Sequence, residues 1–154
     1  MRTDGAARGN PGPAAAGAVL LDADAPGGER AAPVATVSEA LGIATNNVAE
    51  YVALVLALET AERLGAREVE LRLDSQLIVE QLAGRYRVRD PKLAPLYRAA
   101  LERLARLERW SARHVPRAEN RVADALANAA LDRGARPSEA VLRWLPRGLL
   151  DNGR

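Results

Sequence analysis

The sequence predicts an α/β fold in which a mixed five-stranded sheet is flanked by helices. Three observations indicate it. Two apolar segments around a Pro- and Gly-rich turn open the chain, and helical segments then alternate with two short strands. At 154 residues and 48% hydrophobic composition, the chain suffices for one core. Strands joined by a turn pair antiparallel, whereas strands that follow a helix pair in parallel, so the expected sheet is an antiparallel meander plus two parallel strands.

The meander begins with a very short first strand, residues 1–3, which ends at Asp4. A compact turn follows at residues 8–13 (RGNPGP). Residues 14–24 and 31–43 read as the next two strands, joined by a turn at residues 24–28.

A helix is expected over residues 47–64, because apolar side chains cover much of its circumference. Thr45 or Asn46 can cap its start, and Gly65 can end it. Glu50 shares a stripe with Ala53 and residues at helical spacing, so its carboxylate is expected to point toward the packed side.

Residues 67–73 (REVELRL) alternate apolar and polar, which is typical of a strand that ends at Asp74. Asp74 or Ser75 can cap a short helix to about residue 83. Gly84 then breaks this helix, and residues 85–90 form a basic loop.

The remaining elements are a helix over residues 91–108, a strand over 110–115 and a helix over about 120–132 capped by Asn120. Residues 1–134 are expected to form one domain. Residues 135–154 are expected to be a C-terminal appendix, with a short helix around 138–145, rather than a separate domain.

Composition excludes several classes of site. The chain has no cysteine and one histidine, which rules out disulfides, thiolate sites and a Cys/His zinc site. No apolar run reaches the roughly 18 residues of a membrane span, and a signal peptide is not apparent, so a cytoplasmic protein and no membrane partner are expected. Residues 85–121 carry eleven Lys/Arg and four Asp/Glu, which suits a polyanion but equally a solvated helix face.

Four carboxylates in short motifs carry the chemistry. Asp4 and Asp74 are expected at the carboxyl ends of strands, where open α/β sheets bind ligands. Glu50 projects from a helix, and Asp124 lies in a first turn, where the helix dipole favours the ionised form. Carboxylates that converge need cations, and Mg²⁺ prefers oxygen ligands. Read singly, each is also a helix cap or a surface charge.

Four motifs in order resemble those of type 1 ribonuclease H, in the shorter bacterial and archaeal subgroup that lacks a basic protrusion. They are residues 4–13 (DGAARGNPGP), 45–50 (TNNVAE), 74–76 (DSQ) and 114–124 (HVPRAENRVAD). The resemblance covers about residues 2–132. It implies the ribonuclease H fold, endonucleolytic hydrolysis of the RNA strand of RNA–DNA hybrids, and products with 5′-phosphate and 3′-hydroxyl ends.

The resemblance also implies the metal ligands: Asp4, Glu50, Asp74 and Asp124 would hold two Mg²⁺ or Mn²⁺ ions with substrate. His114 lies ten residues before Asp124, as an auxiliary histidine does in the family, and a structural role stays equally open. Arg117 is an alternative auxiliary residue.

Hybrid-binding residues follow from the same resemblance. Backbone groups of the first motif and two amide side chains are expected to face RNA 2′-hydroxyls, which distinguish RNA from DNA. The other polar side chains are expected at bases or DNA phosphate, although turn and cap chemistry explains them too. The backbone candidates are Gly5, Ala6, Ala7 and Arg8, the amide side chains are Asn46 and Gln76, and the others are Asn10, Thr45, Asn47 and Ser75.

Two other functions remain open on sequence alone. One is a non-catalytic nucleic-acid-binding module, which would lack a carboxylate. The other is a different nuclease of the same fold, because fold alone does not separate substrates. Double-stranded RNA also stays open as a second substrate, and a monomer is expected.

Overall fold

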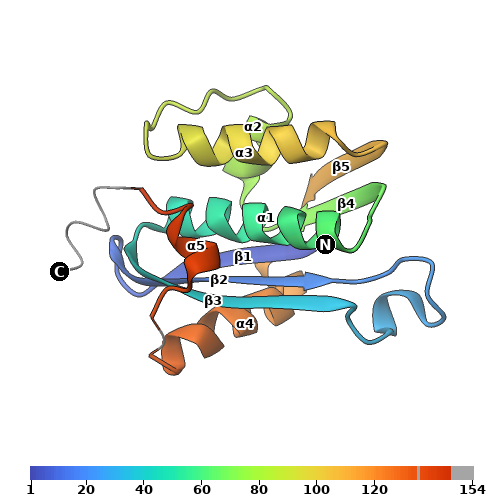
Figure 1. The fold of residues 1–154 in the computed structure, drawn as a ribbon, viewed down its shortest axis with the longest axis horizontal. Helices are drawn as coiled ribbons and strands as arrows, with labels where there is room; N and C mark the ends of the chain where they lie inside the picture. The colour runs from blue at the N-terminus through green and yellow to red at the C-terminus, as the bar shows by residue number, and fades with distance from the viewer. Residues whose placement is uncertain (135, 147–154) are drawn as a thin grey trace.

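The computed structural model describes residues 1–134 and 136–146. Its sheet has five strands in the order β3-β2-β1-β4-β5, so β1 is central (Figure 1). β1 pairs antiparallel with β2, and β2 with β3, whereas β4 pairs parallel with both β1 and β5. The predicted meander and parallel strands are therefore confirmed. The strands are β1 (Arg2–Ala7), β2 (Gly12–Leu20), β3 (Ala35–Ala44), β4 (Glu68–Leu73) and β5 (Arg109–His114).

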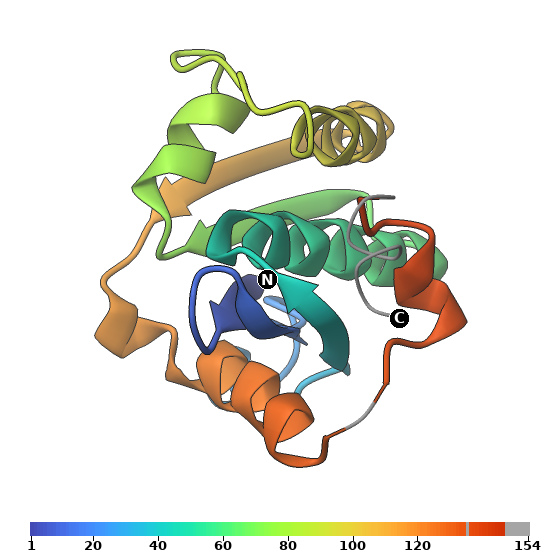
Figure 2. The same cartoon turned by 90° about the vertical axis from the view of Figure 1, so that its left-hand side faces the viewer.

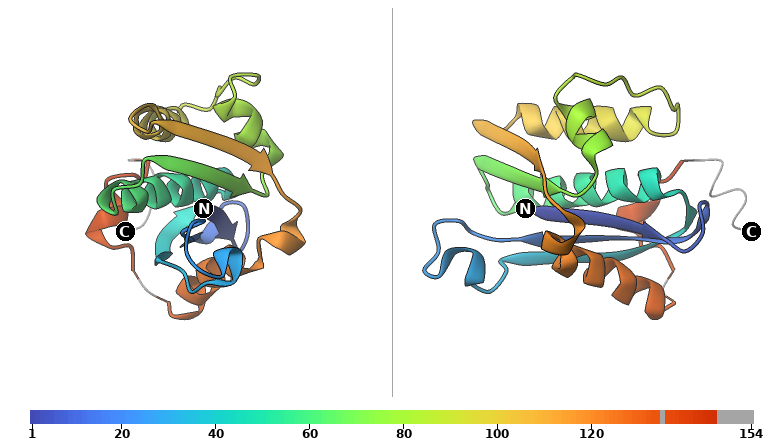
Figure 3. Two further views of the ribbon diagram at one scale, coloured as in Figure 1. Left: turned by 90° about the vertical axis from the view of Figure 1, so that its right-hand side faces the viewer. Right: turned by 180° about the vertical axis from the view of Figure 1, so that it is seen from behind.

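Helices cover both faces of this sheet. α1 packs on β1, β2 and β3 and against α3, and α4 packs on the opposite face of the same three strands (Figure 2). β4 and β5 lie farther along the sheet than the strands on which α4 packs. α2 packs on β4 and β5, and α3 lies on the same side (Figure 3). The helices are α1 (Asn46–Arg63), α2 (Gln76–Leu82), α3 (Ala94–Ala105), α4 (Arg121–Asp132) and α5 (Glu139–Leu142), with single 3₁₀ turns at Gly28–Arg30 and Arg117–Glu119.

The main core lies between the sheet and α1. Twelve of the 18 residues of α1 are buried, which confirms the expectation from its nearly continuous apolar surface. A second, alanine-rich cluster lies under α4 and includes Ala15, Ala127 and Ala130. Small side chains there let α4 lie close to the strands.

The first strand differs from its predicted length. β1 continues to Ala7, so Asp4 is the third residue of a six-residue strand rather than a residue at its carboxyl end. Alternation is hard to see in RTDGAA because the strand is short and central, and Thr3 and Asp4 are both buried.

Two other boundaries shift for local reasons. β2 ends at Leu20 rather than residue 24, because the Asp22 carboxylate accepts a hydrogen bond from the Asp24 amide, an interaction typical of a turn. β3 begins at Ala35 rather than residue 31, after Pro33, which has no amide hydrogen for the ladder.

The described part of the predicted appendix packs against the domain. Val141 is fully buried, and the carboxylate of Glu59 on α1 accepts hydrogen bonds from Arg143 and, at 2.8 Å, from the indole of Trp144. The helix predicted around residues 138–145 is observed over part of that range, as α5. Residues 135 and 147–154 lie outside the described residues.

No helix within residues 1–134 and 136–146 combines the length and the apolar character that crossing a membrane requires.

Candidate active site

The site lies where the two central parallel strands part. β1 and β4 pair only at Arg2–Arg72 and Thr3–Leu73. Asp4 and Asp74 directly follow the last of these pairs, one on each strand. Because the ladder ends there, the two strands separate directly after the positions that bring Asp4 and Asp74 side by side.

Helix α1 brings a third carboxylate, that of Glu50, to this opening. A Cβ placed on Gly5 would lie 2.2 Å from the backbone of Ala49 and Glu50, so only glycine allows α1 to approach β1 this closely. The Gly5 amide also donates to the Glu50 carboxylate. Of the two predicted caps, Thr45 and Asn46, the structure uses Thr45, whose hydroxyl accepts from the Val48 amide at 3.2 Å.

Helix α4 brings the fourth carboxylate from the other face. Gly17 lies opposite Asp4 in the β1–β2 pair, and a Cβ there would lie 2.1 Å from the carbonyl oxygen of Ala123. This close contact puts Asp124, in the first turn of α4, within hydrogen-bonding reach of Asp4.

The predicted carboxylates therefore converge. One oxygen atom from each of Asp4, Glu50 and Asp74 lies within 4.8 Å of the other two. Asp4 is only 4% exposed, and Asp124 adds a fourth carboxylate beside it. An all-oxygen set of this density fits Mg²⁺ or Mn²⁺, since hard divalent cations take carboxylate ligands.

The electrostatics of the cluster point the same way. Burial, reinforced by the charges of Asp74 and Asp124, raises the pKa of Asp4 to about 7. Burial, together with Asp4 and Asp74, raises the pKa of Glu50 well above its usual range. Ionising several neighbouring carboxylates at a largely buried position is unfavourable, and a bound cation would offset that cost.

This repulsion predicts a pH-dependent stability for the metal-free protein. The pKa of Asp4 is higher in the folded protein than in the unfolded chain. The protonated Asp4 carboxyl therefore contributes fully to the free energy of unfolding below about pH 4. The contribution is lost as pH rises through about 7. In the presence of a chelator, Asp4→Asn should therefore be more stable than wild type at pH 8, on the order of 2 kcal/mol, and the difference should shrink toward pH 4. Urea unfolding across this range measures it, and a difference that does not vary with pH would contradict the expectation.

Asn120 is a site residue that sequence reasoning took only for a helix cap. It is fully buried and makes no side-chain cap. Instead its Nδ2 donates to the Thr3 carbonyl at 2.8 Å and to Asp74 Oδ2 at 3.0 Å, which ties both central strands to the start of α4. Nothing in the spacing of residues 114–124 indicates this contact, because it depends on how α4 meets the sheet.

The candidate hybrid-binding residues surround the carboxylates. Asn10 Oδ1 accepts from the backbone amide of Asn46 at 3.0 Å, which joins the β1–β2 turn to the start of α1. Ser75 caps α2, its hydroxyl accepting from the backbone amide of Ile78. The side-chain amide of Gln76 donates to the Glu80 carboxylate at 3.3 Å. Asn46, Asn47 and Gln76 are exposed, whereas Gly5, Ala6, Ala7, Thr45 and Ser75 are half-buried.

Arg8 has a partner on α4. Its guanidinium pairs with Asp132 at 2.6 Å, and both side chains are more than half exposed. Exposed pairs of this kind contribute about 0–1 kcal/mol, so a phosphate group can compete for the arginine.

His114 and Arg117 lie near the site in sequence but do not join the cluster. His114 ends β5 opposite Leu73, and Arg117 begins a 3₁₀ turn before α4. Both are exposed, and neither side chain contacts a carboxylate of the described chain. Their auxiliary roles stay predictions.

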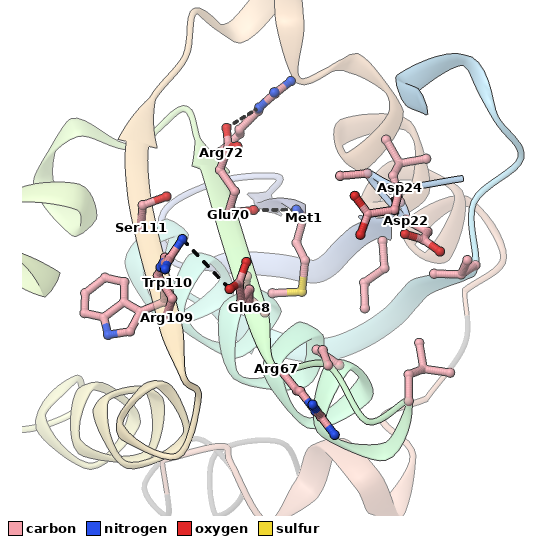
Figure 4. A pocket seen from close by; sticks show the side chains of 18 of the residues that line it. Met1, Asp22, Asp24, Arg67, Glu68, Glu70, Arg72, Arg109, Trp110 and Ser111 are labelled. Carbon is pink, nitrogen blue, oxygen red and sulfur yellow. Dashed lines mark hydrogen bonds and ion pairs between the residues drawn. The ribbon is translucent and has the colours of Figure 1, made fainter. Parts of the chain in front are cut away.

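A cavity of about 1020 Å³ lies elsewhere, at the starts of β1 and β4 (Figure 4). Its wall contains two ion pairs, Arg72 with Glu70 at 3.0 Å and Arg109 with Glu68 at 3.9 Å. It contains none of the four converging carboxylates, so we place the chemistry at the carboxylate cluster.

Comparison with known proteins agrees with this site. The reverse transcriptase-like family matches residues 2–130. A ribonuclease HI of Halobacterium salinarum is 52% identical over 129 residues, covering 84% of this chain and 62% of that protein. A bifunctional protein of Mycobacterium tuberculosis is 44% identical over 140 residues, covering 91% of this chain and 37% of that protein. The chain thus spans less than two thirds of these relatives' length.

Solved structures are similar over most of the chain. A crystal structure of RNase H1 from the archaeon Halobacterium salinarum has a TM-score of 0.79 at 50% identity, covering 86% of this chain and 96% of that one. LC11-RNase H1, crystallised in complex with an RNA/DNA hybrid, has a TM-score of 0.77 at 39% identity, with the same coverage. The sequence motifs, the five-stranded sheet and these relatives together show that the chain belongs to the type 1 ribonuclease H family.

Proposed function

We propose that this chain is an endonuclease that hydrolyses the RNA strand of RNA–DNA hybrids. The single observation that carries the proposal is the convergence of three carboxylates within 4.8 Å, with Asp124 beside them, in a chain that belongs to this family. Support for the substrate comes from LC11-RNase H1, 39% identical, which binds an RNA/DNA hybrid in its crystal structure.

In this proposal Asp4, Glu50, Asp74 and Asp124 hold two Mg²⁺ or Mn²⁺ ions. When bound, the ions would supply an activated water and stabilise charge on the leaving 3′ oxygen, and products would carry 5′-phosphate and 3′-hydroxyl ends. The protein supplies orientation. Asn120 fixes one oxygen of Asp74, and the Gly5 amide fixes Glu50, so the carboxylates are held before any ligand arrives.

Recognition of the RNA strand falls to groups around the cluster. The backbone of Gly5–Arg8 and the exposed side chains of Asn46 and Gln76 are suitably placed to contact 2′-hydroxyls. Aromatic residues make up only 3% of the chain, so phosphate and backbone contacts are expected to outweigh base stacking.

The alternative of a non-catalytic binding module finds no support in the cluster, because such a module would lack a carboxylate and none of the four is missing. Another nuclease of this fold would differ in substrate, and that difference is directly measurable.

A cleavage assay on three duplexes of the same sequence tests the proposal. With Mg²⁺, we expect cleavage of the RNA strand in an RNA–DNA hybrid, weaker or no cleavage of double-stranded RNA, and none of double-stranded DNA. The physical reason is that 2′-hydroxyl contacts require RNA at the site. Cleavage of double-stranded DNA, or inactivity toward the hybrid with both Mg²⁺ and Mn²⁺, would contradict the proposal.

A further inference from the structure

Asn128, one helical turn after Asp124 on α4, links the carboxylate cluster to the β1–β2 turn. Its Nδ2 donates to the backbone oxygen of Asp124 at 3.0 Å and to the Asp124 carboxylate at 3.3 Å. Its Oδ1 faces Arg8, whose guanidinium lies at 3.5 Å and pairs with Asp132 at 2.6 Å. Thus the side chain contacts the fourth carboxylate at one end and the substrate-side turn at the other.

The geometry explains why an amide is needed here. Asp124 and Asn128 are separated by four residues on one helix, so their side chains lie on the same face. The carboxylates of Asp124 and Asp4 lie within hydrogen-bonding reach of each other, and they repel each other when both are ionised. A donor on the adjacent turn offsets this repulsion, and Arg8 on the acceptor end selects the orientation in which nitrogen faces Asp124.

We propose that Asn128 is a positioning residue that holds the Asp124 carboxylate in the cluster, with Arg8 and Asp132 orienting its amide. The inference rests on the proposed function, because it takes Asp124 as a metal ligand. In this proposal Asn128 acts through Asp124 rather than as a ligand of the ion.

Hydrogen-bond partners of metal-binding carboxylates typically contribute 10- to 100-fold to metal affinity or activity. Losing the partner leaves Asp124 free to leave the cluster, so the ion loses a ligand for part of the time. The fold should lose little, because Asn128 is half-buried and lies on a helix packed mainly through Ala123, Ala127 and Ala130.

Two substitutions separate the contacts. Asn128→Leu keeps the branched shape of the side chain, with bulkier methyl groups, and removes its hydrogen bonds to Asp124 and Arg8. Asn128→Ser keeps a donor for the Asp124 carbonyl, since a helical serine bonds back to the residue four positions earlier, but does not reach the carboxylate. Asp124→Asn is the reference variant, because it changes the carboxylate itself.

The decisive measurement is Mn²⁺ binding by titration calorimetry on the whole chain, with the free energy of unfolding in chelator as the structural control. We expect Asn128→Leu and Asn128→Ser each to weaken Mn²⁺ affinity about tenfold, with unfolding changed only slightly. The Mg²⁺ concentration for half-maximal hybrid cleavage should rise by the same factor.

The outcomes are distinct. If Asp124→Asn weakens binding and the Asn128 variants do not, the inference is overturned while the proposed function stands. Wild-type affinity in Asn128→Ser alone would overturn it too, since the backbone contact would then suffice. If Asp124→Asn also binds Mn²⁺ like wild type, Asp124 is not a ligand, and the premise and the inference fail together, even where the wild-type chain still cleaves the hybrid.

Discussion

Asp74→Asn is expected to lower Mg²⁺-dependent cleavage of an RNA–DNA hybrid by about 10³-fold or more, an increase of about 4 kcal/mol in activation free energy. Asp74 contributes an oxygen to the three-carboxylate cluster, and the substitution leaves a carbonyl oxygen that can still accept from Asn120. Removing one negative charge from the cluster weakens the hold on divalent cations. Single-turnover cleavage, with hybrid affinity measured in parallel, tests this.

Hybrid affinity should change little in the same variant, because the proposed function assigns the contacts with sugars and phosphates to other residues. Glu70→Gln is a matched control. It removes a carboxylate from the same strand, but one that pairs with Arg72 and Arg113 away from the cluster. Near-normal turnover by Asp74→Asn, or an equal loss in Glu70→Gln, would defeat the assignment of the site.

Gly5→Ala is expected to be strongly destabilising. The new Cβ would lie 2.2 Å from the backbone of Ala49 and Glu50, and neither strand β1 nor helix α1 can yield by rotating a side chain. Overpacking of this kind costs about 3 kcal/mol or more, and the displaced helix carries Glu50 away from Asp4. Urea unfolding and Mn²⁺ titration should both show the loss.

The control for this substitution is Gly84→Ala, the same chemical change where no atom lies within 4 Å. Its cost comes from a positive φ of 78° alone, about 1 kcal/mol, and its metal affinity should match wild type. If Gly5→Ala is no more destabilising than Gly84→Ala, close packing of α1 on β1 does not hold the site together.

The sequence was most informative where local pattern and tertiary environment agree. The nearly continuous apolar surface of residues 47–64 predicted a buried helix, which the structure has at Asn46–Arg63, and REVELRL alternates because β4 has one face in the core. Caps at Thr45 and Ser75 follow from local hydrogen bonding and were found where the residue types indicated.

Local pattern failed where long-range contacts decide. Asp4 lies within β1 rather than at its end, because pairing with β2 continues to Ala7 although pairing with β4 stops at Thr3. Asn120 has the residue type of a cap, yet its amide serves Thr3 and Asp74, which are 117 and 46 residues away. Contacts between residues so far apart in the chain leave no periodic pattern in the sequence.

By itself, the sequence determined which residue types are available for chemistry and the order of elements that carry them. Only the tertiary structure decided that the carboxylates meet. Their meeting depends on two glycines, Gly5 and Gly17, at which helices on opposite faces of the sheet come within backbone contact of β1 and β2. Close approach of two backbones is a property of the packed fold, and a glycine in a strand looks the same in sequence whether or not a helix lies on it.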